Sequence, residues 1–137
     1  MNPISDPIQI FGEALVDIFG EEVVPGGAPF NVARHLSAFG LNPIMITRVG
    51  ADAHGAAILK EFDRFGLSTD GVQVDRESPT GRVFVRMTEH GHSFDIPDGQ
   101  AFDRIDAEEA IDCVGRSGKF GYVYCGKIGR ASCRERV

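Results

Sequence analysis

A pair of glycines followed by an asparagine is the segment whose chemistry is easiest to interpret. Gly26 and Gly27 precede Ala28-Pro29, and Asn31 follows within what would be the first turn of a helix. Paired glycines let a ligand approach the backbone closely, and a helix N-terminus offers free N–H groups and a partial positive charge. The pattern suits a polyhydroxylated or anionic ligand. Composition alone favours an ordinary turn and helix start.

Asp17 is a second candidate for ligand binding. It lies near the end of the first apolar strand region, and ligands of open α/β sheets bind beyond the carboxyl ends of strands. An ionised carboxylate at that position can accept hydrogen bonds from two sugar hydroxyls. The alternative is a solvated turn residue.

The elements that must position these residues alternate between strand and helix. Apolar runs predict buried strands at 8–11 and 43–49. Residues 15–19 are expected to continue the first strand after a polar break. Residues 21–25 are expected to form a loop or a short excursion. Apolar residues at helical spacing predict helices from 28 to about 39 and from 52 to about 65. Alternation over 71–96 predicts a β-hairpin with one wet face. A helix over 105–114 and a buried strand over 120–125 follow. This order indicates βαβ units, a parallel sheet and a small β flap.

Composition excludes several classes of protein and partner. The 137 residues are 42% apolar and 25% charged, as in one soluble globular domain or a piece of one. The net charge of −6 argues against a nucleic-acid partner. The chain lacks an apolar run that could cross a bilayer and a secretory signal, which argues against a membrane partner. Three cysteines without a CxxC pair indicate a reducing cytoplasm.

Four segments, taken together, resemble the PfkB (ribokinase-like) carbohydrate kinases. Gly12–Asp17 and Pro25–Ala33 resemble the N-terminal signature, Arg48–Gly55 resembles the next conserved segment, and Thr80–Arg82 with the hairpin after it matches the lid. The Gly-Glu and Gly-Gly-Ala-Pro variants look most like the fructokinase-type branch. The resemblance covers about residues 8 to 126. It implies a three-layer α/β/α fold with a parallel central sheet and a small β lid at roughly 71–96.

The resemblance also implies an activity and roles for individual residues. The family transfers phosphate from ATP, with Mg²⁺, to a sugar hydroxyl. By that resemblance Asp17 holds sugar hydroxyls, Gly26 and Gly27 bring backbone against the sugar, and Asn31 binds a further hydroxyl. Arg86, or Phe84 beside it, would contact the sugar from the lid. A homodimer through the lid is possible for a full-length member.

Departures from the family pattern limit what this chain is expected to do. The family's catalytic base lies in a Gly-Ala-Gly-Asp motif that occurs nowhere in this sequence, and a Walker loop is absent too. Residues 1–126 are therefore interpreted as the truncated sugar-binding part of a kinase. We expect this part to hold no catalytic residue and to bind neither nucleotide nor metal. The alternative is a non-catalytic sugar-binding or regulatory module. A dinucleotide-binding domain is disfavoured because GxGxxG is missing after the first strand.

The last eleven residues, 127–137, differ in character from the rest. They hold four basic residues against one acidic residue and do not resemble the family. They can be back-translated to a DNA sequence that resembles a common sequencing-library adapter. We therefore expect this segment to be a non-native tail. A genuine basic tail is the alternative.

Overall fold

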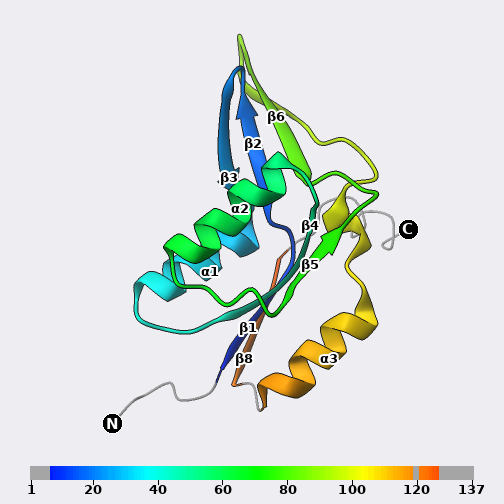
Figure 1. The fold of residues 1–137 in the computed structure, drawn as a ribbon. Coiled ribbons are helices and arrows are strands. Elements are labelled where there is room, and N and C mark those ends of the chain that lie inside the picture. The colour runs from blue at the N-terminus through cyan, green and yellow to red at the C-terminus, as the bar shows by residue number, and fades with distance from the viewer. Residues whose placement is uncertain (1–6, 119–120, 127–137) are drawn as a thin grey trace, which may run out of the picture.

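The computed structural model describes residues 7–118 and 121–126 (Figure 1). The expected tail at 127–137 lies outside the described residues. Eight strands, three α-helices and a short 3₁₀ helix are described, in this order: β1 (Ile8–Phe11), β2 (Leu15–Phe19), β3 (Glu22–Gly26), α1 (Ala28–Ala38), β4 (Ile44–Gly50), α2 (Ala53–Arg64), β5 (Val72–Asp75), β6 (Gly81–Thr88), β7 (Gly91–Asp95), η1 (Ala101–Arg104), α3 (Ala107–Ser117) and β8 (Tyr122–Cys125).

A parallel sheet forms the centre of the molecule. Its strand order is β5-β4-β1-β8, and every neighbouring pair is parallel. Helices α1 and α2 cover one face, and α3 lies on the other (Figure 1). The predicted three-layer α/β/α arrangement is therefore confirmed, and the strands over 8–11 and 44–50 lie where the apolar runs placed them.

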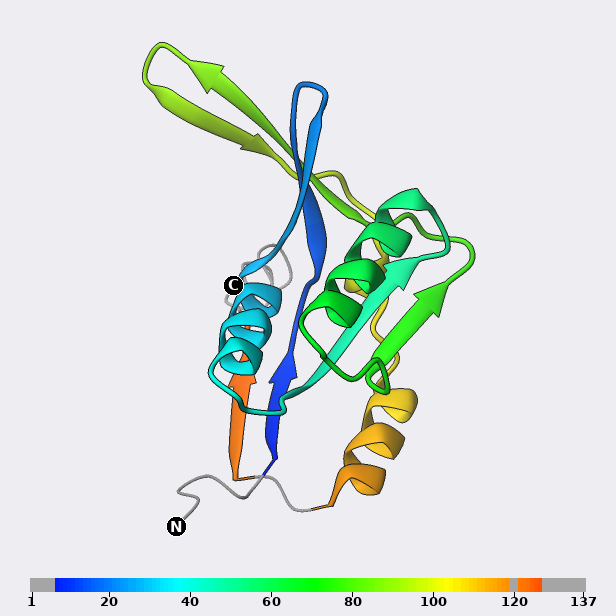
Figure 2. The same cartoon turned by 60° about the vertical axis from the view of Figure 1, so that its left-hand side comes forward.

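A second, four-stranded sheet projects beyond the layered body (Figure 2). Its order is β3-β2-β6-β7. The two central strands β2 and β6 are parallel, and each is flanked by an antiparallel partner. Two segments far apart in the sequence therefore build one sheet.

Three expectations about this region need correction. Leu15–Phe19 is not a continuation of the first central strand, because it pairs with β3 and β6 in the second sheet. The expected loop after it is strand β3. The lid range 71–96 is divided, since Val72–Asp75 pairs with β4 in the central sheet. Apolar alternation identifies a strand but not the sheet that it joins, which depends on partners distant in sequence.

The starts of α1 and α2 follow the sequence signals. Gly27 is the N-cap of α1, with a φ of 103°, and Pro29 occupies its first turn, where a missing N–H is not needed. Asp52 is the N-cap of α2, and its side chain accepts a hydrogen bond from the Gly55 N–H. Between the two helices, the buried Phe30 and Phe62 rings stack with centroids 5.1 Å apart.

Strand β8 differs from the expected buried strand. It pairs with β1 at the edge of the central sheet, yet Tyr122, Val123 and Tyr124 are 61%, 60% and 39% exposed. Pairing with β1 satisfies only the backbone groups on one side of the strand and does not cover its side chains. None of the helices in the described part of the chain is long and apolar enough to cross a membrane.

Candidate functional site

Asp17 and Gly26 lie against each other in the second sheet. Asp17 sits in the middle of β2, opposite Val24 of β3 and Val83 of β6. A β-carbon placed on Gly26 would lie 2.6 Å from Asp17 Oδ2. Asp17 was expected near the carboxyl end of a central strand, and that placement is wrong. Its carboxylate nevertheless faces Gly26, the first glycine of the pair.

The Asp17 carboxylate is partly removed from water. Burial raises the pKa of this group above its ordinary value. A half-buried carboxylate whose hydration is incomplete gains more from a hydroxyl donor than a fully solvated one does. The arrangement suits a neutral ligand that carries several hydroxyls.

Gly27 and Glu13 form the next contact. A β-carbon on Gly27 would lie 2.8 Å from the Glu13 carbonyl oxygen and 3.4 Å from Glu13 Cγ, so only glycine fits this N-cap. Glu13 Oε2 is buried and has no hydrogen-bond partner among the described residues. Burial raises the pKa of Glu13, although a hydrogen bond from its own backbone N–H opposes the shift. Glu13 was not predicted as a site residue, although the Gly-Glu pair at positions 12 and 13 was part of the family resemblance.

Asn31 joins the same segment from α1. Its N–H donates to the Gly27 carbonyl at 2.8 Å, and its side-chain Oδ1 accepts a hydrogen bond from Arg34. Arg34 also donates to the Pro25 carbonyl at 3.2 Å. Asn31 and Asp17 therefore both adjoin the Pro25–Gly27 segment. Arg34 was not predicted as a site residue. Its spacing of three residues from Asn31 could have indicated it, because residues i and i+3 of a helix are neighbours.

Arg86 is not brought to this group. In β6, Val83 lies opposite Asp17 and shares its face of the sheet. Side chains alternate along a strand, so Arg86 points to the opposite face. It is exposed and pairs with Ser93 of β7. In this arrangement Arg86 and Asp17 cannot hold one ligand from the same face.

The Arg48–Gly55 segment has a structural role at the junction of the two sheets. Asp52 Oδ2 accepts a hydrogen bond from the Thr80 N–H at 2.9 Å, and Asp52 Oδ1 accepts one from Thr80 Oγ1 at 2.6 Å. Thr80 Oγ1 accepts one from the Gly50 N–H at 2.8 Å. Burial alone would raise the pKa of Asp52, but the bonds from Thr80 and Gly55 outweigh it and lower that pKa. The motif therefore ties the start of β6 to the central sheet.

A second anchored carboxylate lies at the end of β5. The Asp75 carboxylate accepts hydrogen bonds from the N–H groups of Ser78 and Glu77, each at 2.8 Å, and from Arg48 Nε at 3.0 Å. The N–H donors of Ser78 and Glu77, followed by the Arg48 guanidinium, hold the pKa of Asp75 far below its ordinary value. The segment leading to β6 is fixed at this point.

We expect acid to unfold the chain partly through Asp75 and Asp52. Their folded-state pKa values lie below the ordinary 3.8, so the unfolded chain takes up protons first. The stability that they contribute is complete above about pH 5 and is lost as the pH falls from about 4 toward their folded pKa values. Asp75→Asn should be less stable than wild type in urea unfolding at neutral pH, with the difference shrinking as the pH falls to about 3. A difference that stays constant with pH would contradict this assignment.

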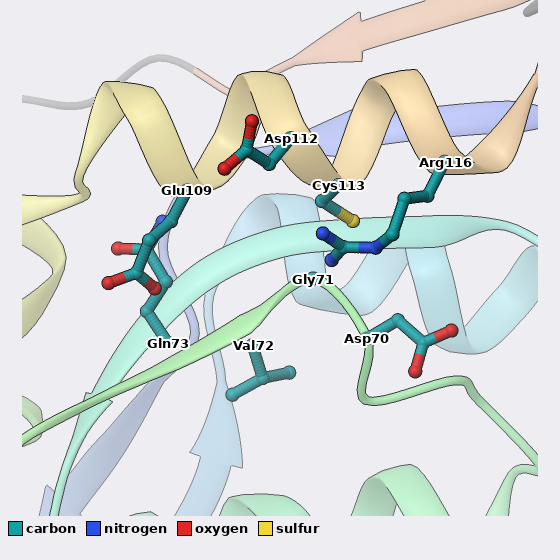
Figure 3. Close-up of a pocket in the computed structure, with 8 residues that line it drawn as sticks. All are labelled: Asp70, Gly71, Val72, Gln73, Glu109, Asp112, Cys113 and Arg116. Carbon is teal, nitrogen blue, oxygen red and sulfur yellow. The ribbon is translucent and has the colours of Figure 1, made fainter.

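A shallow hollow lies elsewhere, between β5 and α3 (Figure 3). Its volume is about 120 Å³, and the residues around it are mainly charged or small: Asp70, Gly71, Val72, Gln73, Glu109, Asp112, Cys113 and Arg116. It contains none of the candidate sugar-binding residues. Within residues 7–118 and 121–126, no three His, Cys, Asp or Glu side chains gather as they would around a metal ion.

Known proteins similar to this chain are carbohydrate kinases. The sequence profile described as pfkB family carbohydrate kinase matches residues 4–136. An uncharacterized sugar kinase from Pyrococcus horikoshii is 32% identical over 113 residues, which cover 74% of this chain and 36% of that protein. Its structure in complex with ATP superposes with a TM-score of 0.71 at 30% identity, covering 78% of this chain and 39% of that one.

Two fructokinases are also similar to this chain in sequence or in structure. Fructokinase-2 from Oryza sativa is 27% identical over 116 residues, covering 82% of this chain and 34% of the rice protein. The crystal structure of a fructokinase from Xylella fastidiosa has a TM-score of 0.68 at 28% identity, covering 77% of this chain and 37% of that one. This chain thus spans little more than a third of the length of these relatives. It belongs to the pfkB family of carbohydrate kinases.

Proposed function

We propose that this chain is the sugar-binding part of an ATP-dependent, fructokinase-type carbohydrate kinase. The observation that carries the proposal is the contact between the Asp17 carboxylate and Gly26, next to the Gly27 N-cap of α1. Asp17 would accept hydrogen bonds from sugar hydroxyls. Gly26 and Gly27 would let the sugar approach the backbone, and Asn31 would add an amide contact.

The remaining chemistry is proposed to lie outside this chain. The sequence has no Gly-Ala-Gly-Asp segment, and it spans 36% of the Pyrococcus horikoshii relative. Phosphoryl transfer requires an activated acceptor and stabilised γ-phosphate charge. ATP, Mg²⁺ and the catalytic base would therefore be held by sequence that is not present here. The second sheet would cover the sugar and exclude water.

We propose two further features of the protein. A homodimer through the second sheet is supported by exposed apolar side chains on it, since Phe19, Met87 and Phe94 are 44%, 78% and 66% exposed. We also propose that residues 127–137 are non-native, although the match to the family profile, which runs through residue 136, counts against this. Amplification of the locus from genomic DNA tests the origin of residues 127–137. Native DNA that encodes them would contradict a non-native origin.

The function is tested by separating sugar binding from catalysis in the full 137-residue chain. We expect calorimetry to detect D-fructose binding, and we expect no ADP release above the blank with ATP, Mg²⁺ and D-fructose. Turnover at an ordinary kinase rate, about 1–100 s⁻¹, would refute the assignment of the catalytic machinery to other sequence. Absence of binding to D-fructose and to other common hexoses would refute the sugar site.

A further inference from the structure

Arg34 lies between the candidate sugar site and α2. Its Nη2 donates hydrogen bonds to Asn31 Oδ1 and to the Pro25 carbonyl. Its Nη1 donates to Glu61 Oε2 at 3.3 Å, and its guanidinium carbon lies 4.6 Å from the centroid of the Phe30 ring. The side chain is 19% exposed. A planar, donor-only group with this many partners has one available orientation.

The orientation of Arg34 determines that of the Asn31 amide. A guanidinium has no acceptor atom, so the Asn31 atom that faces it must be the carbonyl oxygen. The Nδ2 group is then directed away from Arg34. An amide with free rotation could present either its oxygen or its nitrogen to a ligand, whereas this one presents its nitrogen.

We propose that Arg34 is a positioning residue that makes Asn31 a hydrogen-bond donor to the bound sugar. The inference rests on the proposed function and adds the polarity of one contact: the sugar atom facing Asn31 is an acceptor oxygen. Asp17 carries only acceptor oxygens when it is ionised, so it accepts hydrogen bonds from hydroxyl groups of the sugar. The two side chains therefore recognise opposite hydrogen-bonding features of the carbohydrate.

The second Arg34 bond extends this role to the glycine pair. The Pro25 carbonyl lies in β3 directly before Gly26, and Arg34 ties it to the first turns of α1. One guanidinium thus fixes the Asn31 amide relative to the backbone that the sugar would approach. Loss of Arg34 would loosen both contacts at once.

Two variants separate positioning from simple structural support. Asn31→Asp keeps an oxygen for Arg34 and strengthens that pair by charge, but it removes the Nδ2 donor. We expect unchanged or higher thermal stability and an affinity for D-fructose about tenfold lower. Arg34→Met keeps much of the apolar stem on Phe30 and removes the donor group. We expect affinity to fall several-fold and the Asn31 side-chain ¹⁵N–¹H signals to move even without sugar.

Glu61→Gln is the matched control. It removes the charge of the ion pair while keeping an acceptor for Arg34, so we expect affinity within about twofold of wild type. Wild-type affinity in Asn31→Asp, or unmoved Asn31 amide signals in Arg34→Met, would overturn the inference. If wild type binds none of the hexoses, the sugar site itself fails. The Asn31 amide signals still decide whether Arg34 fixes that group.

Discussion

Gly55→Ala is expected to lower the free energy of unfolding by about 3 kcal/mol, the upper part of the range for overpacked interiors. A β-carbon at position 55 would lie 2.1 Å from the Gly50 carbonyl oxygen, and a backbone atom in a central strand cannot move aside cheaply. The same helix turn holds Asp52, which anchors Thr80. Because domains are stable by only about 5–15 kcal/mol, this is a large loss. Urea unfolding at neutral pH measures it.

Gly115→Ala is the control for that substitution. Gly115 lies within α3, and a β-carbon there meets no atom within 4 Å. Alanine is the better helix former, so we expect a gain of about 0.5–1 kcal/mol. If both variants lost or gained similar stability, the close approach at Gly55 would not be the cause.

Gly26→Ala is expected to have the largest effect on sugar binding. The added methyl carbon would lie only 2.6 Å from Asp17 Oδ2, which is too close for both atoms to keep their positions. A carboxylate at the end of a side chain can rotate aside, so the fold is retained while the carboxylate leaves the site. Hydrogen bonds to charged groups contribute about 1.5–3 kcal/mol, which corresponds to a loss of about 10- to 100-fold in affinity.

Calorimetry with D-fructose, alongside thermal unfolding, tests this second prediction. Asp17→Asn supplies the comparison, because it removes the charge without moving the group. We expect a similar loss of affinity in both variants and melting temperatures close to wild type. Full affinity in Gly26→Ala would mean that the Asp17 carboxylate does not face the sugar.

Local features of the sequence predicted the central part of the fold well. The second helix was expected to begin at residue 52, and the hydrogen bond from the Gly55 N–H to the Asp52 side chain confirms this start. Gly27 and Pro29 begin α1 as expected. Both signals are local, since each depends on residues within one turn. The contact between Asp17 and Gly26 is different, because it requires β2 and β3 to pair, whereas residues 21–25 were expected to be a loop or a short excursion.

The position of Arg86 shows why the rest of the site was harder to predict. Along β6, the side chains of Arg82, Phe84 and Arg86 lie on one face, because successive residues of a strand alternate between faces. Which face also carries Asp17 depends on the register between β2 and β6, two strands separated by more than sixty residues. A shift of one residue in register would exchange the two faces. Contacts of this kind depend on tertiary packing rather than on any local pattern.

The pairing of β2 with β6 constrains how the second sheet can move. The chain passes between the two sheets four times, before β2, after β3, before β6 and after β7. A hairpin flap that opened on one pivot would have to break the parallel pair at its centre. We therefore expect the four strands to move as one rigid unit, with any movement over a ligand shared among all four connections between the sheets. The hydrogen bonds between Thr80 and Asp52 tie down the connection before β6, so we expect the second sheet to rotate about that point.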